Sequence, residues 1–377
     1  MSVAKPPKPP QVLTARSIGE VHESVEIISQ YFKNNPNNSK NIRPILWYRA
    51  QEKYTWQLIP TLFRDTKYAG NGYTQLHLRE DYRIQGFEAR ARHLVEDKPA
   101  NRFAWQEVMQ HHRHKTRLLD WTESLDISLA FALEAFLDPN NNSKDLEIRR
   151  KGLTPCIWVL NPYLLNSKVY RSFYKKPYGI ELIKRAIQDL PPITRINATR
   201  TLKRKLESGK SRFFGNNNIA PEYDPRMAGL YNLSAIDDWR QANQNRIHFM
   251  LMQEEFNPLF YLLARYYLDG IPVKVEDLPP LAVVHPYHSS RIRQQKGAFT
   301  VFPHYMWRDD VEEFYKNSFN INSLAMDKQP GIEQAIYQIR IADPECMAIE
   351  LLTSGKRISD IYPELDSYAK DLEYQVY

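Results

Sequence analysis

Short β-rich segments and amphipathic helical segments follow each other along this chain without regular alternation. Residues 45–51, 155–162 and 335–341 are rich in Ile, Val, Trp and Tyr, which is typical of strands. Residues 17–33 carry apolar side chains at helical spacing, and residues 75–96 contain many charges and few helix-breaking residues. Because a doubly wound sheet needs strands and helices to alternate, this order predicts an α+β fold with a mixed central sheet and flanking helices.

The rest of the chain supplies further elements of both kinds. Gly355 is a plausible end signal for a helix, since glycine commonly follows the last helical turn. We expect further strands over 281–287 and at the end of 289–303, and further helices over 124–137, 254–269, 309–319, 344–354 and 359–373.

Composition distinguishes the two regions of predicted strands from a tail and from a middle segment. Residues 1–12 are rich in Pro and Lys and are expected to be a disordered tail. The predicted strands lie before about residue 165 and after about residue 271. Between roughly 166 and 270 the chain is predicted to be helical and irregular. Its segment 195–212 holds seven Lys or Arg against one Glu, which suits either a solvated surface or a nucleic-acid contact.

Bulk composition narrows the class of protein. The net charge is +7, but 44 acidic residues offset most of the basic ones, so the balance is compatible with an anionic ligand without indicating nucleic acid. Two cysteines without a Cys-x-x-Cys spacing favour a reducing compartment. The N-terminus lacks an apolar secretory segment, and the run 258–268 is too short to span a bilayer. We therefore expect a cytoplasmic protein without a membrane partner.

The segment from Gln110 to Ala132, reading QHHRHKTRLLDWTESLDISLAFA, concentrates polar and titratable side chains before an apolar helix. Because helix N-termini attract anions, the segment is predicted to place an anion site at a helix entrance. His111 and His112 suit phosphate binding or general-base work, or else merely cap a helix. No third or fourth ligand stands at zinc spacing, so no metal site is predicted.

Thr116, Arg117 and Asp120 give the more specific functional signal in this segment. A hydroxyl beside a guanidinium suits an anion, and Asp120 would orient that guanidinium or a histidine. The structural alternative is a buried Arg–Asp pair that fixes a turn, and both interpretations stay open here.

Two other segments carry polar side chains beside predicted strands. Arg49 and Gln51 follow Trp47 and Tyr48, and a guanidinium beside aromatic rings suits a planar, phosphorylated ligand or simply a solvated strand edge. Arg291 and Gln295 precede Gly297, which indicates a bend or a close backbone approach. The chain contains no P-loop, Rossmann glycine pattern or Gly-x-Ser-x-Gly elbow, which excludes those classes of enzyme.

Three distant segments together resemble the FRG domain. They are WYRAQ…WQLIPTLFR (47–64), the segment 110–132, and RIRQQKGAFTVF (291–302); the segments 158–162 and 358–373 agree as well. The resemblance implies one domain in two parts, an N-terminal part over residues 13–165 and a C-terminal part over residues 271–377, with residues 166–270 as a basic helical insertion between them.

Two family positions differ in this chain. The family's Phe-Arg-Gly reads Tyr48-Arg49-Ala50, and its His-Gly-x-x-Thr-Arg places Arg113 where glycine is usual. Glycine at position 50 would allow a positive φ or a close approach of a ligand, and the added Arg113 and His114 would change access to the site. The family has no assigned activity. It occurs in bacteria and phages, in settings that suggest phage defence.

We expect a site for a nucleotide or another phosphorylated ligand, with NAD as one possible cofactor. The order of an early strand-borne Arg, a middle motif and a late polar residue also resembles ADP-ribosyltransferases, although Gln295 then stands where a catalytic Glu is needed. A nucleic-acid-binding protein and a non-catalytic recognition module are the alternatives. The expected catalytic residues are His112, Asp120 and Gln295, and the expected ligand-binding residues are Arg49, Gln51, His111, Thr116, Arg117 and Arg291.

Overall fold

The computed structural model describes a large part of the chain in separate ranges. They are residues 8–34, 45–64, 73–95, 99, 102–137, 144–166, 169, 279–283, 290–303, 324–329, 331–356 and 358–360, with isolated positions 188, 192, 196 and 200. The predicted helices 254–269 and 309–319 and most of 359–373 lie outside these ranges. So does nearly all of the insertion 166–270 with its basic segment.

The described strands form one mixed sheet in the order β1-β7-β4-β2-β3-β6-β5. β1 and β7 are parallel, and the other neighbouring pairs are antiparallel. This confirms the predicted α+β class with a mixed central sheet. The strands are β1 (Val12–Ala15), β2 (Trp47–Gln51), β3 (Leu118–Thr122), β4 (Cys156–Leu160), β5 (Leu281–Val283), β6 (Gly297–Val301) and β7 (Ile336–Ile341).

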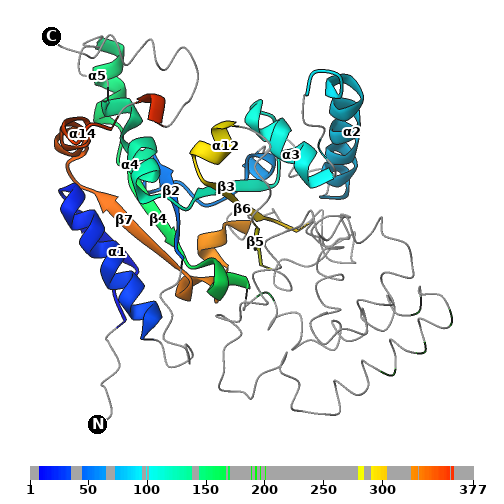
Figure 1. The fold of residues 1–377 in the computed structure, drawn as a ribbon, viewed down its shortest axis with the longest axis horizontal. Helices are drawn as coiled ribbons and strands as arrows, with labels where there is room; N and C mark the ends of the chain where they lie inside the picture. The colour runs from blue at the N-terminus through cyan, green and yellow to red at the C-terminus, as the bar shows by residue number, and fades with distance from the viewer. Residues whose placement is uncertain are drawn as a thin grey trace, which may run out of the picture.

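The helices gather in two groups around this sheet (Figure 1). α1 packs on β1 and β7, α4 packs on β2 and β4, and α14 packs against both helices. α2 and α3 pack together at the other end of the sheet, beside β3. The described helices are α1 (Ile18–Lys33), α2 (Tyr73–Ala91), α3 (Arg102–His111), α4 (Leu125–Leu133), α5 (Lys144–Lys151), α12 (Ser290–Gln294) and α14 (Pro344–Thr353), with the short 3-10 helices η1 (Thr61–Arg64), η3 (Glu134–Phe136), η7 (Met326–Lys328), η8 (Ile332–Gln334) and η9 (Ile358–Asp360).

Local signals explain where several of these elements begin and end. Ser17 caps α1 by accepting a hydrogen bond from the amide of Glu20, and Asp343 caps α14 in the same way. Gly355 follows α14 with φ of 84°, the left-handed conformation expected at that place. An added Cβ on Gly297 would meet the Ile292 side chain at 2.9 Å and the Ile292 carbonyl at 3.5 Å, so a side chain rather than a backbone group crowds this position.

The histidine-rich segment folds differently from the prediction. α3 ends at His111, and the strand β3 stands between the histidines and α4. The histidines therefore lie at a helix C-terminus, where the dipole is negative, and the predicted anion site at a helix entrance is wrong. Ser124, whose hydroxyl accepts a hydrogen bond from the amide of Ile127, caps α4.

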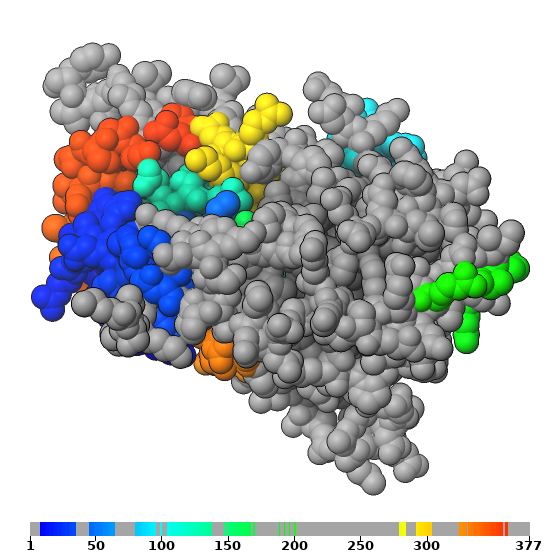
Figure 2. All heavy atoms as spheres, turned by 60° about the horizontal axis from the view of Figure 1, so that its bottom comes forward, coloured from blue at the N-terminus to red at the C-terminus, as the bar shows by residue number. Residues whose placement is uncertain are grey.

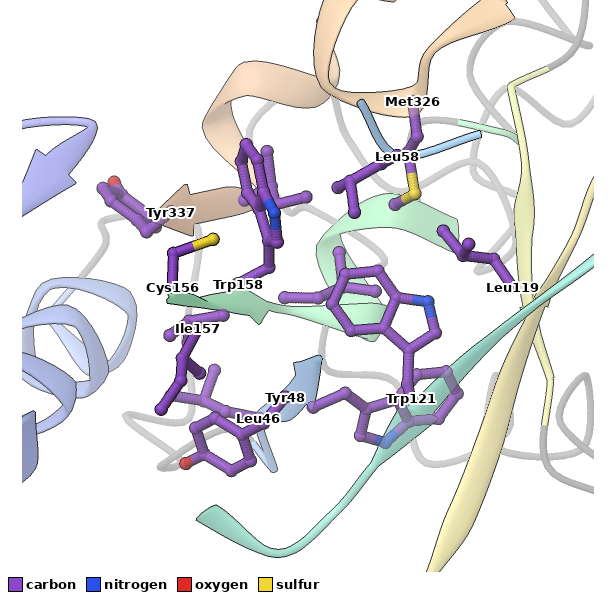
Figure 3. Packing of buried hydrophobic residues seen from close by; sticks show 14 of the residues in the cluster. Leu46, Tyr48, Leu58, Leu119, Trp121, Cys156, Ile157, Trp158, Met326 and Tyr337 are labelled. Atoms are coloured by element: carbon purple, nitrogen blue, oxygen red, sulfur yellow. The ribbon is translucent and has the colours of Figure 1, made fainter. Parts of the chain in front are cut away.

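Alternation along the central strands separates two faces of the sheet. Figure 3 shows Leu46, Tyr48 and Ile157 on one side of β4, and Leu58, Trp158 and Met326 on the other. The first side is the one that α4 covers. On the second side the segment around Leu58 is joined to η7, because the Leu58 carbonyl accepts the amide of Met326 at 3.0 Å. The second side also carries Arg49, which pairs with Trp158.

α12 forms a small bridge between the sheet and the C-terminal segment. Gln294 donates hydrogen bonds to the carbonyls of Ser359 and Asp360 at 3.0 and 2.9 Å. Figure 2 shows the surface of α12 directly against that of the last described residues. The C-terminal end of α12 and the turn after it are thus held from two sides, since the hydroxyl of Thr122 also donates to the Gln295 carbonyl at 2.6 Å.

Candidate functional site

The centre of the sheet contains a gap between β2 and β3. β2 pairs with β4 along its whole length, and β3 pairs likewise with β6, but β2 and β3 are paired only at Tyr48 and Thr122. Beyond that pair the two strands diverge. The Arg49 guanidinium fills part of the gap and donates a hydrogen bond to the Asp120 carbonyl at 2.6 Å. A side chain thus satisfies a backbone group that a continuous sheet would pair with a strand.

A cavity of about 450 Å³ occupies this gap. Its size lies within the range of small-molecule sites. Aromatic side chains contribute much of the wall, and charged side chains of both signs project from several elements. The main side chains are those of Tyr48, Trp56, Trp121 and Phe131 (aromatic), Arg49, Arg64 and Arg113 (basic), and Glu52, Glu107, Asp120 and Glu134 (acidic).

Arg49 and Arg64 place two guanidinium groups close to one carboxylate. Burial lowers the pKa of both side chains, and the positive charge of Arg64 lowers the pKa of Arg49 further. The negative charge of Asp120 raises the pKa of both, and its carboxylate lies 3.8 Å from the Arg49 guanidinium. The buried Arg49 Nε has no hydrogen-bond partner among the described residues. Since arginine stays protonated, this arrangement offers donors to an added anion.

A hydrogen-bond chain holds Asp120 in its orientation. The Thr116 hydroxyl donates to the Gln110 side-chain carbonyl, and the Gln110 amide donates to the Asp120 carboxylate. The Thr116 amide in turn donates to the hydroxyl of Thr61 at 3.4 Å. Gln110 therefore connects the end of α3 to β3 at the edge of the cavity.

The residues expected from the sequence divide into two sets. Those in the first set line the cavity together: Arg49, Gln51, His111, Asp120 and Gln295. The second set, His112, Thr116 and Arg117, does not appear among the described residues that line it. The side chain of Arg291 lies outside the described residues.

Each member of the second set has other contacts. Arg117 is 2% exposed, forms an ion pair with Glu80 of α2 at 3.3 Å and donates to the Phe302 carbonyl at 3.0 Å. The exposed ring of His112 lies edge-on to that of His111, with 5.1 Å between centroids. The structural alternative for Arg117, a buried ion pair, is therefore present. Its acidic partner is Glu80, however, and not the predicted Asp120.

Several cavity residues, among them Trp56, Arg64, Glu107 and Glu134, were not singled out from the sequence. Arg64 stands at the end of η1 and donates from Nε to the Ile59 carbonyl at 2.8 Å, and Trp56 precedes it in the same loop. Glu107 lies one helical turn before Gln110 on α3, and Glu134 follows α4. Arg64 closes the segment WQLIPTLFR, so the family resemblance contained a signal for it. The two glutamates had none, because only the tertiary fold brings them to the gap.

Arg113 has an unusual backbone for an arginine. Its φ is 61°, in the left-handed region, directly after α3. Its amide donates to the Gln110 carbonyl at 2.8 Å, and the amide of His114 donates to the Met109 carbonyl at 2.9 Å. These two bonds define a Schellman motif, in which the left-handed residue is usually glycine. The structure thus supplies a reason for glycine at this family position. Ala50, at the other departure, has no positive φ and pairs with Ile157 in β2.

The part of the chain that the structure describes offers neither a metal site nor a membrane-spanning helix. No group of three or more His, Cys, Asp or Glu is placed there to hold a metal ion. No helix there is long and apolar enough to cross a membrane.

Comparison with known proteins gave a single finding. The family model of the FRG domain matches residues 44–141. No curated protein and no solved structure matches the chain. The match extends from β2 to the end of α4 and η3, and so includes both strands of the gap as well as α3. Residues 44–141 are therefore similar to the FRG domain, and the cavity between β2 and β3 is lined largely by residues of this segment.

Proposed function

We propose that the gap between β2 and β3 binds a phosphorylated ligand of nucleotide size. The observation that carries this proposal is the pair of guanidiniums at the cavity wall, from the half-buried Arg49 and the exposed Arg64, which both lie near the carboxylate of Asp120. Phosphate oxygens bind arginine through charge-assisted hydrogen bonds, often two at once. Aromatic walls from Trp56 and Trp121 suit the planar part of such a ligand.

The proposal is tested by titrating the full chain with ADP-ribose in a calorimeter. We expect Arg64→Gln to weaken binding at least tenfold, since it removes a positive charge from the phosphate. Arg92→Gln is the matched control, because Arg92 is an exposed arginine just after α2 that pairs with Glu88. Equal affinities of wild type and Arg64→Gln, or no binding at all, would refute the proposal.

A transferase reaction on NAD is the second candidate function. Gln295 lines the cavity but cannot serve as the catalytic carboxylate that such a reaction needs. Glu107 and Glu134 line the same cavity and could supply that carboxylate. Release of nicotinamide from NAD, lost in Glu107→Gln or Glu134→Gln, would support it. No nicotinamide release and no thermal shift with NAD, with Arg49→Ala behaving like wild type, would reject it.

Three wider expectations belong to the same proposal. The two cysteines, Cys156 and Cys346, are both free, which supports a cytoplasmic setting. A role in phage defence rests on the FRG resemblance. Nucleic-acid binding rests on the basic segment 195–212, and a gel shift at low salt with DNA and RNA tests it.

A further inference from the structure

A second cavity of about 390 Å³ lies on the same face of the sheet as Arg49. Cross-strand neighbours share a face, and β2, β4 and β7 are paired so that Arg49, Trp158 and Gln338 form one row. Trp158 and Gln338 line the second cavity, whereas Arg49 lines the first. Two strand spacings, about 10 Å, separate Arg49 from Gln338.

Trp56 contributes to the walls of both cavities. Its side chain is 45% exposed, which is uncommon for so large an apolar ring. The adjacent loop is fixed rather than loose, since the Gln338 side chain donates to the Tyr54 carbonyl at 3.0 Å. The indole is thus held on a fixed loop at the junction between the two cavities, where a ligand that extends from one to the other must pass it.

The chemistry of the second cavity differs from that of the first. Arg340 stacks on the Tyr54 ring with 4.1 Å to the ring centroid, and it also donates to Gln338. Amide side chains of Gln11, Gln57 and Gln338 line the cavity beside Tyr54 and Trp158. The buried amide nitrogen of Gln11 has no hydrogen-bond partner among the described residues. A buried donor left in this way is costly unless a ligand or water accepts its hydrogen bond.

We propose that this second cavity is a subsite for a nucleobase, and that it belongs to the same ligand whose phosphates lie at Arg49 and Arg64. A nucleobase is flat enough to stack on Trp56 or Tyr54 and presents ring and carbonyl acceptors to the Gln11 amide. The spacing of about 10 Å between the two ends matches the extent of a nucleoside diphosphate better than that of a free phosphate. This inference rests on the proposed function and names the substrate class as nucleotides rather than phosphorylated compounds at large.

The test compares ADP with inorganic pyrophosphate, which lacks a base, on the full chain. We expect ADP to bind more tightly than pyrophosphate to wild type. Gln11→Leu should reduce ADP affinity about tenfold and leave pyrophosphate affinity unchanged, because it removes a donor to the base alone. Gln30→Leu on α1 is the matched control, since Gln30 bonds Glu26 away from both cavities.

A second variant tests the same subsite in case the Gln11 substitution disturbs folding. Glu333 lines the second cavity from an exposed position, so Glu333→Trp should fill the cavity without changing the core. This variant should also weaken the binding of ADP and leave the binding of pyrophosphate unchanged. Equal affinities for ADP and pyrophosphate would show that the nucleobase subsite is wrong. The same conclusion follows if Gln11→Leu and Glu333→Trp bind ADP like wild type while Arg64→Gln binds it more weakly, and in that case the phosphate site stands. If neither compound binds, both proposals are wrong.

Discussion

Replacing Arg113 with glycine should make the protein more stable. Arg113 holds φ of 61° at the left-handed position of the Schellman motif that ends α3. A side chain with a Cβ costs about 1–2 kcal/mol in that conformation, whereas glycine adopts it freely. Glycine also gives the unfolded chain more freedom, a loss of about 0.5–1 kcal/mol. The net gain expected for Arg113→Gly is about 1 kcal/mol in the free energy of unfolding.

Urea unfolding followed by circular dichroism measures this gain. Arg113→Ala is the matched control, because it removes the same charge and keeps the Cβ. We expect Arg113→Gly to raise the urea midpoint and Arg113→Ala to leave it close to that of wild type, with the same slope for all three proteins. Equal midpoints for the glycine and alanine variants would show that the left-handed backbone is not the source of strain.

The same two variants test why an arginine stands at this position. Arg113 lines the cavity, so its guanidinium is available to a ligand in the gap. If the ligand uses it, both variants should bind ADP-ribose several-fold more weakly, although the glycine variant is the more stable protein. Strained residues are often kept at binding sites for such reasons. Unchanged affinity in both variants would reject a ligand role for Arg113.

Three further predictions concern the scaffold around the site. Arg117→Met should lower the free energy of unfolding by about 3–5 kcal/mol, because it removes the cation of the buried ion pair with Glu80. Adding Glu80→Leu should restore most of the loss. An unchanged urea midpoint for Arg117→Met would contradict the buried ion pair. Burial raises the pKa of the Cys156 thiol to about 12, so at pH 8 a thiol reagent should label the exposed Cys346 alone in the folded chain, and rapid labelling of both would be evidence against this burial. Gly355→Ala should cost about 1 kcal/mol in urea unfolding, since φ of 84° suits glycine, and no loss would argue against that backbone.

The helices and strands with a clear pattern of apolar residues were predictable from the sequence. α1 has an apolar stripe and a Ser17 cap, and β4 and β7 are short apolar runs between turn residues. β3 was missed because its five residues, LLDWT, lie in a segment that was interpreted as the polar entrance of the helix 124–137. β1 was missed for another reason. It has only four residues, begins at the end of the Pro-rich segment, and exists through pairing with β7 more than three hundred positions later.

Site prediction succeeded where one strand placed a side chain and failed where the site depends on tertiary contacts. Arg49 was identified because it follows two aromatic residues in a strand. Thr116 and Arg117 drew attention as a polar motif, but their side chains mainly hold α3 and α2 against the sheet. Glu107 reaches the cavity because α3 is held in this way. The conspicuous motif thus organises the site, and part of the lining comes from residues with no local signal.

The two guanidiniums of the gap are not equivalent as probes of function. Arg49 donates to the Asp120 carbonyl at the point where β2 and β3 diverge, so its removal leaves a backbone acceptor of the central sheet without that donor. A loss of binding in an Arg49 variant would therefore combine two effects, on the ligand and on the gap itself. Arg64 bonds only the Ile59 carbonyl of its own loop among the hydrogen bonds described, and the pairing of β2 and β3 does not involve it. Binding measured with Arg64→Gln consequently reports the phosphate contact, and Arg49→Lys, which keeps a charge near Asp120, separates the two effects at the other residue.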